Sequence, residues 1–204
     1  MNIKIIGITQ REEEVISYEE KRDSLDQKLV QWVSDLGMLP VPIPNNLSSD
    51  DLFNWLNLLN VDSIILSGGN NIGESKKRDT TENNLLLWAQ NNKKPVLGIC
   101  RGMQMMSVFS GEGLVKISNH VKVRHSLVMS DDSISLPTEV NSFHNYGLRN
   151  CPKGYRVLAF SDDGSIEAIA HNELNWEGWM WHPERDSLFS LIEQNRFKTM
   201  VFDD

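Results

Sequence analysis

The sequence predicts an α/β fold: a mostly parallel central sheet flanked by helices, with additional short antiparallel strands. Two observations predict this class. In the first half, short apolar runs alternate with segments of helical periodicity, and in the second half short strand-like runs are separated by turn residues. No internal repeat or low-complexity linker interrupts the 204 residues, so we expect 1–204 to form a single domain.

The first half alternates strand and helix in order. Residues 4–8 predict a strand, 19–35 carry apolar side chains at helical spacing before Gly37, and 39–43 predict the next strand. Ser48, Ser49 or Asp50 can cap a helix over 52–59, which a buried strand over 61–66 follows. A helix over 82–91, a strand over 95–99 and a helix over 102–109 complete the pattern. Ligands gather at the carboxyl ends of such parallel strands, where Gly68, Gly69 and Cys100 stand.

The second half predicts short, partly antiparallel strands over residues 121–129, 133–136, 155–160 and 165–170. Acidic residues and Gly164 mark the turns between them. A last helix is expected over residues 187–195.

Composition excludes several classes of function. Lys and Arg total 20 against 28 Asp and Glu, a net charge of -8, which disfavours nucleic acid or an anionic membrane as a partner. The first residues form neither a signal peptide nor a membrane span, so we expect a cytoplasmic protein. The two cysteines, Cys100 and Cys151, are too few for a disulfide scaffold and lack the close partners of a structural zinc site.

Cys100 lies in the segment Gly98-Ile99-Cys100-Arg101-Gly102, between the predicted strand and helix. Two glycines permit a sharp turn there, which places the cysteine at the positive end of the helix dipole, where a thiolate is stabilised. The same turn directs the N–H of Arg101 toward the space above the sulfur. With the N–H of Gly69, it would form an oxyanion hole.

An isolated cysteine is more often a small buried core residue. The segment Trp181-His182-Pro183-Glu184 favours the catalytic interpretation, because a nucleophilic cysteine needs a base and the base needs an acceptor that orients it. A single proline separates His182 from Glu184 and could let the carboxylate reach the imidazole.

Four ordered motifs carry a resemblance over nearly the whole chain: Leu66-Ser67-Gly68-Gly69, Gly98 to Gln104, Val140-Asn141-Ser142-Phe143-His144, and Trp181-His182-Pro183-Glu184. On these the sequence resembles the class I glutamine amidotransferases, and Arg78-Asp79-Thr80-Thr81-Glu82 is similar to an element of the stand-alone gamma-glutamyl hydrolases. The resemblance implies that Cys100 is the nucleophile, His182 the acid and base, and Glu184 its orienting residue.

The resemblance also implies a substrate pocket. Gln104 and the backbone around Ser142 and Phe143 would hold the glutamyl head, and Glu82 is a candidate for its ammonium group. Met180 and Asn145 depart from the family, which often has Gln and His at these positions. Both departures lie on the leaving-group side of the expected pocket.

The predicted reaction is a two-step acyl transfer that releases glutamate from a small gamma-glutamyl substrate without a metal or an organic cofactor. The resemblance of the full sequence, rather than any single motif, implies gamma-glutamyl-CDP-amidate as the substrate, which would yield cytidine diphosphoramidate for capsular polysaccharide modification, and gamma-glutamyl-GABA is the alternative. A basic run, Lys76-Lys77-Arg78, could meet a diphosphate, although a solvated loop explains such a run as well. Arg11, Lys122 and Arg124 are further candidates.

Two other classes remain open. The chain could be a glutaminase subunit that delivers ammonia to a separate synthetase, a partner that we do not favour, or a binding protein that lost the chemistry. His120 and His125 could suggest a metal site, but strand alternation would direct them to opposite faces, so no metal is expected. Trp176 could line the pocket and stack on a flat group.

Overall fold

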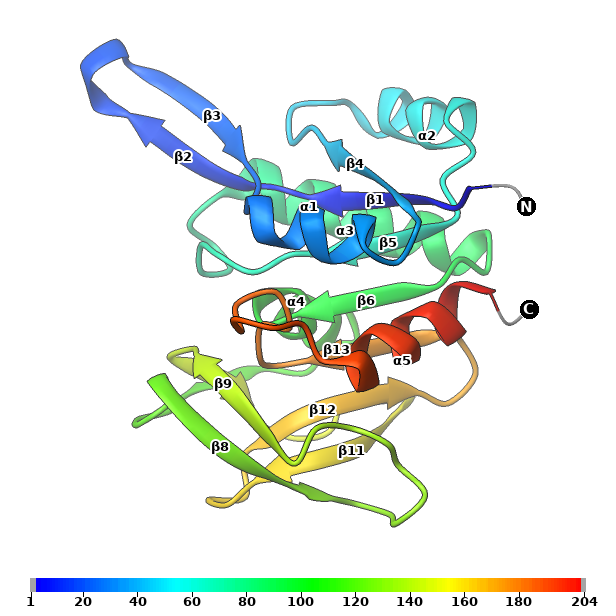
Figure 1. Cartoon of the computed structure of the whole chain (residues 1–204). Helices are drawn as coiled ribbons and strands as arrows, with labels where there is room; N and C mark the ends of the chain where they lie inside the picture. The colour runs from blue at the N-terminus through cyan, green and yellow to red at the C-terminus, as the bar shows by residue number, and fades with distance from the viewer. Residues whose placement is uncertain (1–2, 203–204) are drawn as a thin grey trace.

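The computed structural model describes residues 3–202, and within them nine strands form one sheet in the order β4-β1-β5-β6-β13-β12-β11-β8-β9 (Figure 1). The first five strands of this order run parallel, and the last four are joined antiparallel. The predicted fold class is therefore confirmed. The sheet strands are β1 (Ile5–Thr9), β4 (Leu39–Ile43), β5 (Ser63–Leu66), β6 (Val96–Ile99), β8 (Val121–Met129), β9 (Glu139–Phe143), β11 (Tyr155–Ser161), β12 (Ile166–His171) and β13 (Trp176–Trp179).

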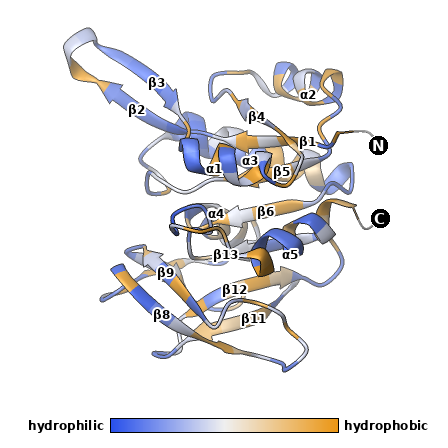
Figure 2. Cartoon of the chain, viewed as in Figure 1, coloured by the Kyte–Doolittle hydropathy of each residue, from blue (hydrophilic) through white to orange (hydrophobic). Residues whose placement is uncertain are grey.

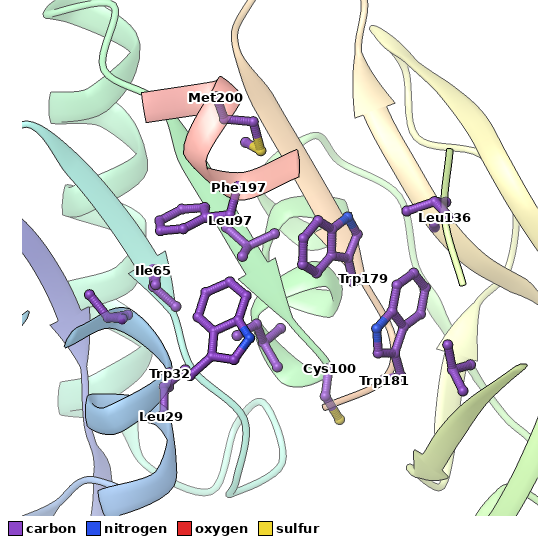
Figure 3. Packing of buried hydrophobic residues seen from close by; sticks show 14 of the residues in the cluster. Leu29, Trp32, Ile65, Leu97, Cys100, Leu136, Trp179, Trp181, Phe197 and Met200 are labelled. Atoms are coloured by element: carbon purple, nitrogen blue, oxygen red, sulfur yellow. The ribbon is translucent and has the colours of Figure 1, made fainter. Parts of the chain in front are cut away.

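Helices cover both faces of the parallel half. The helices are α1 (Gln27–Ser34), α2 (Ser49–Leu58), α3 (Lys76–Asn91), α4 (Arg101–Phe109) and α5 (Leu191–Phe202). Side chains of α1 and α5 pack on one face, as Figure 3 shows for Trp32 and Phe197 beside Leu97 of β6. Side chains of α2, α3 and α4 pack on the other face, as Leu56, Leu86 and Met103 do. The nearly continuous apolar strands between these layers are what a parallel sheet buried on both faces requires.

The region expected as one long helix over residues 19–35 is different in the structure. Residues 11–24 form an antiparallel hairpin of β2 (Arg11–Val15) and β3 (Glu20–Ser24), joined by a short 3-10 turn at Ile16–Tyr18. The helix begins only at Gln27, where Asp26 accepts a hydrogen bond from the Lys28 N–H as its cap. The hairpin projects from the carboxyl end of β1 and is mostly hydrophilic (Figure 2), so it carries no apolar pattern that could predict a strand.

Three other elements begin or end at residues different from those predicted. α3 begins at Lys76, six residues before the predicted start, because Ser75 caps it. Residues 133–136, predicted as a strand, form a loop, and the strand lies at Glu139–Phe143 instead. α5 occupies Leu191–Phe202 rather than 187–195. A small sheet of β7 (Leu114–Lys116) and β10 (Tyr146–Leu148) lies outside the main one. Among the described residues no helix has the length and apolar character needed to cross a membrane.

Candidate active site

Cys100 stands on a strained turn between β6 and α4. Its backbone has φ 51° and ψ −103°, a conformation that costs free energy for any residue with a side chain. Gly98 and Gly102 flank the turn, and neither position has room for a side chain. A Cβ on Gly98 would lie 2.7 Å from the backbone of Gly102 and Met103, and one on Gly102 would overlap the Leu66 carbonyl oxygen. The local sequence therefore forces the strand directly into the helix and places the sulfur at the helix N-terminus.

His182 and Glu184 lie in the loop after β13, both almost completely buried. Nδ1 of His182 donates a hydrogen bond of 2.7 Å to Oε1 of Glu184. Because a carboxylate can only accept, this bond leaves Nε2 as the nitrogen available for a proton exchange with a second group. The sequence expectation that Glu184 reaches the imidazole across one proline is met.

The pKa of His182 shows which charges surround it. Burial alone lowers this pKa, but the sulfur of Cys100 and the carboxylate of Glu184 outweigh burial and raise the pKa to about 9. The imidazole next to Cys100 is therefore protonated at neutral pH. A protonated imidazole beside the sulfur is the state from which a cysteine attacks a carbonyl.

Asn141 holds His182 from the antiparallel half. Its Oδ1 accepts a 3.1 Å hydrogen bond from the His182 N–H, and its Nδ2 donates one of 2.8 Å to the His182 carbonyl. Gly68 shapes the other side, because an added Cβ would collide with the imidazole ring. The role of Asn141 was not predicted from the sequence, although the residue lies in one of the quoted motifs. No local pattern marks this role, because the His182 backbone that Asn141 binds lies 41 residues further along the chain.

Arg78 holds the loop after β5. Its guanidinium is fully buried and donates to the carbonyls of Ser67, Gly68 and Gly69 at 2.7, 3.0 and 2.9 Å. In a trans peptide the N–H points opposite the carbonyl of the preceding residue, so the N–H of Gly69 points away from Arg78. The N–H of Arg101, the first residue of α4, has no acceptor within its helix. These are the two donors expected to form an oxyanion hole.

Glu82 does not line the cleft that contains Cys100, contrary to the expectation that it holds an ammonium group. It is fully buried, and its Oε1 accepts hydrogen bonds of 2.9 Å from both Thr9 Oγ1 and Arg78 Nε. Its Oε2 pairs with Arg101. Burial raises the pKa of Glu82, but Arg78 and Arg101 outweigh it, so the net shift is downward. Both oxygens are occupied, and Glu82 instead joins the two arginines that support the site.

An open cleft of about 400 Å³ contains Cys100. Its predicted members are Gly69, Arg101, Gln104 and Phe143, and its other lining residues are Asn70, Asn71, Glu74, His144 and Asn145. A larger hollow of about 620 Å³ beside α5 contains neither a cysteine nor a histidine.

Two of the predicted binding residues are fixed by the β9–β10 segment. Gln104 Nε2 donates 2.8 Å to the Tyr146 carbonyl, and the Phe143 ring lies edge-on to His182 at 6.0 Å between centroids. Ser142 is not a lining residue. Its side chain is completely buried and donates 2.7 Å to the His120 carbonyl, so its hydroxyl is committed away from the cleft.

Two arginines flank His182. Arg11 was a candidate from the sequence, without a geometric argument, and Arg185 was not predicted. Arg11 of the hairpin and Arg185 border a narrow hollow together with Gly69, His182 and Glu184. The basic run does not lie there. Arg78 is buried, and the two lysines border a separate hollow that shares no residue with the cleft around Cys100, lined by Asn45, Asn46, Leu47, Ser48, Lys76, Lys77, Thr80 and Thr81.

Three other expectations are wrong or find no support in the geometry. Trp176 is buried at the opposite end of β13 from His182, where its Nε1 donates to the Lys94 carbonyl, so it cannot stack on a substrate. Arg124 pairs with Glu139 and Asp186. His120 and His125 do not point to opposite faces, since their ring centroids lie only 4.2 Å apart.

Comparison with known proteins identifies the family. The family model described as Peptidase C26 matches residues 4–184, which is most of the chain. The chain belongs to the Peptidase C26 family. This glutamine amidotransferase-like hydrolase family agrees with the class I resemblance of the four motifs.

Two relatives and one solved structure extend the comparison. A gamma-glutamyl-CDP-amidate hydrolase from Campylobacter jejuni is 33% identical over 92% of this chain and 94% of its own length. A glutamine-hydrolyzing GMP synthase subunit from Picrophilus torridus is 31% identical over 76% of this chain and 81% of its own. The solved structure of a GMP synthase subunit from Thermoplasma acidophilum superposes with a TM-score of 0.76 at 20% identity, covering 98% of this Peptidase C26 chain and 94% of that one.

Proposed function

We propose that this protein is a cysteine-dependent hydrolase that cleaves a gamma-glutamyl amide bond and releases glutamate. The observation that carries the proposal is the arrangement at the turn. Cys100 is held in a strained conformation at a helix N-terminus, beside an imidazole whose far nitrogen is bonded to Glu184. This succession of thiol, imidazole and carboxylate supports the proposal, because acyl transfer requires a nucleophile, an acid–base group and an orienting carboxylate in that order.

In the first step the Cys100 sulfur attacks the gamma-carbonyl carbon and forms a C–S bond. The carbonyl oxygen becomes an oxyanion, which the N–H groups of Gly69 and Arg101 stabilise. The His182 imidazolium then donates its proton to the departing nitrogen as the C–N bond breaks. The result is a gamma-glutamyl thioester, a free amine or amidate, and a neutral His182.

In the second step a water molecule attacks the thioester carbonyl while neutral His182 accepts one of its protons. The C–S bond breaks, the sulfur leaves as a thiolate, and glutamate is released. Glu184 holds the imidazole in one orientation through both steps. The chain's own residues therefore account for each proton transfer.

We place the glutamyl head in the cleft, with Glu74 in the role first expected for Glu82. Glu74 lines the cleft, and two hydrogen bonds to its Oε2 and Oε1 from Asn71, at 2.7 and 2.6 Å, fix its carboxylate. These bonds lower the pKa of Glu74, which keeps it negative for an ammonium group. Gln104 contributes a polar amide to the same cleft.

We propose gamma-glutamyl-CDP-amidate as the substrate, with cytidine diphosphoramidate as the second product. The Campylobacter relative supports this choice, because it matches over nearly its entire length. Arg11 and Arg185 border the hollow beside His182, and their carboxylate contacts are long, 3.5 Å from Arg11 Nε to Glu13 and 3.8 Å from Arg185 Nε to Glu184, which leaves their other nitrogens for a diphosphate. They replace the basic run of α3 in this role.

The test is glutamate release by the purified protein alone with gamma-glutamyl-CDP-amidate, gamma-glutamyl-GABA and glutamine. We expect the highest kcat/KM with the nucleotide adduct. Cys100→Ala should lower turnover by at least about 10³-fold with an unchanged circular dichroism spectrum. Substantial activity in Cys100→Ala would overturn the mechanism, and equal rates with all three substrates would overturn the substrate assignment alone.

A second candidate function is a glutaminase subunit that passes ammonia to a separate synthetase. The Picrophilus torridus relative, a glutamine-hydrolyzing GMP synthase subunit, specifically favours this alternative. A protein of that kind is expected to hydrolyse glutamine only when its synthetase is added. Glutamate release from the nucleotide adduct by the protein alone would exclude it.

A further inference from the structure

The antiparallel half contains a group of buried histidines and one glutamate that the proposed reaction does not use. His120 precedes β8, His125 lies within it, His144 follows β9, and Glu167 lies on β12. Glu167 is 0% exposed, His120 1% and His144 4%, whereas His125 is half-buried. Three separate segments therefore bring ionisable side chains together inside the protein, where isolated charges are costly.

A β-bulge creates this group. Residues five apart on a regular strand point to opposite faces, but the β8–β9 register shifts between Val121 and Val123, and Lys122 has a φ of 57°. The extra residue turns His120 to the same side as His125. Donor atoms of these two rings and of Glu167 all lie within 4.8 Å of one another.

His120 and His144 each have one ring nitrogen that faces away from Glu167 and one that faces it. The hydrogen bond of the first nitrogen determines whether the second carries a proton or a lone pair. His120 Nε2 donates 2.9 Å to Asp163, and His144 Nδ1 donates 3.1 Å to the Tyr146 carbonyl. In a neutral ring the second nitrogen carries no proton, so it presents a lone pair. Both face the same Oε1 of Glu167, His120 Nδ1 at 3.4 Å and His144 Nε2 at 3.6 Å.

This arrangement brings lone pairs and a carboxylate together without a positive charge between them. Both inner histidine nitrogens, both Glu167 oxygens and Nε2 of His125 have no hydrogen-bond partner among the described residues. Buried polar atoms are almost always partnered, and several unpartnered acceptors that converge form an arrangement that a bound cation would satisfy.

We propose that His120, His125, His144 and Glu167 bind one divalent transition-metal ion, zinc being the ion whose preferences the donors match. Zinc takes imidazole nitrogen and carboxylate oxygen at about 2.0–2.2 Å in tetrahedral geometry, which places neighbouring donors about 3.4 Å apart. The distances from Glu167 Oε1 to His120 Nδ1 and His144 Nε2, 3.4 and 3.6 Å, agree with this donor separation.

The surroundings fit a structural site rather than a second catalytic one. Asp163 orients His120 from outside, and Asp163 is itself held by Ser161 at 2.7 Å and by the Ser165 N–H at 2.9 Å. Such outer carboxylates are typical of histidine-zinc sites. The metal would tie β12 to β8 and to the end of the β8–β9 pair where Val121 lies opposite Phe143, and so support the cleft wall at Phe143.

The experiment uses the full chain with Cys100→Ala, so that the active-site thiol cannot bind the metal. Zn²⁺ is titrated by calorimetry, and Co²⁺ absorption reports the coordination geometry. We expect one Zn²⁺ per chain, a tetrahedral Co²⁺ spectrum, and a Tm that rises by roughly 5–10 °C when Zn²⁺ is about 100-fold above its Kd.

The matched variants are His125→Gln, within the group, and His171→Gln, a half-buried histidine outside it. His125→Gln should weaken Zn²⁺ binding at least tenfold, and His171→Gln should leave it unchanged. Absence of stoichiometric binding, or equal binding by both variants, would overturn the proposal. Circular dichroism checks that each variant is folded, and Glu167→Gln provides a second loss of binding that does not depend on His125.

Discussion

In the parallel half of the sheet the candidate catalytic residues follow directly from strand ends, whereas in the antiparallel half the supporting residues are brought together by a bulge and by pairing between distant segments. Cys100 and Gly69 are close because β5 and β6 are neighbours whose carboxyl ends share one edge. His120 and His125 are close only because β8 loses its regular alternation. Local sequence is therefore a better guide to the first region than to the second.

The two halves meet at His182. β13 pairs with β6 in the parallel half and with β12 in the antiparallel half, so the loop that follows it lies at their junction. Glu184 acts within this loop, Gly68 borders the imidazole from the parallel half, and Asn141 holds it from the antiparallel half. Substitutions at these three positions test how much each half contributes.

The largest of these effects is expected for Glu184→Gln. The amide removes the charge that orients and stabilises the imidazolium, so kcat should fall by about 10²–10⁴-fold while the fold is retained. Steady-state kinetics measure the loss. The exposed Glu173→Gln is the matched control and should keep the original rate. A fall of less than threefold in Glu184→Gln would remove this carboxylate from the mechanism.

Gly68→Ala should lower kcat by about 10²-fold, because the new Cβ would displace the imidazole by an appreciable fraction of an ångström. Gly113→Ala is the control, since a Cβ there meets only Arg149 at 3.9 Å. The Tm of both variants should be measured as well. If Gly68→Ala were as active as Gly113→Ala, the parallel half would not determine the position of the imidazole.

Asn141→Ala tests the contribution of the antiparallel half. It removes two hydrogen bonds to the His182 backbone, so we expect kcat to fall by about tenfold and the free energy of unfolding to fall by about 2 kcal/mol. Chemical denaturation and kinetics measure the two effects. Asn150→Ala, on an exposed loop, should change neither. Unchanged kinetics in Asn141→Ala would mean that the parallel half alone positions His182.

The smallest effect is a pH dependence set by His182, whose pKa is raised to about 9 in the folded protein. The raised value stabilises the fold fully below an unfolded pKa of about 6.5, and this contribution is lost as the pH rises through about 9. The imidazolium also protonates the leaving nitrogen, so kcat/KM should fall to about half its maximum near pH 9. NMR titration of His182 measures the pKa directly. In Cys100→Ala it should be lower, and an unchanged value would contradict the role of the sulfur.

The buried ion pairs below the site show where a sequence motif misled. Arg78 and Glu82 stand four residues apart on α3 and pair with each other, while Arg101 reaches Glu82 from α4. The resemblance implied that Glu82 holds the substrate's ammonium group, but its side chain points into the protein, where both of its oxygens are paired. Only the packing of α3 against α4 determines that direction, because a charged residue in a helix carries no local sign of whether it faces a cleft or a buried arginine.

The sequence by itself determined the class of fold, the turn at Cys100 and the pairing of His182 with Glu184. Each of these depends on neighbouring residues: apolar periodicity, two glycines that leave no room for a Cβ, and a single proline between His182 and Glu184. The tertiary structure decided which charges line the cleft beside Cys100, which arginines flank His182 and which histidines meet around Glu167. These outcomes depend on strand register, a bulge and helix packing, which arise from contacts between residues far apart in the chain.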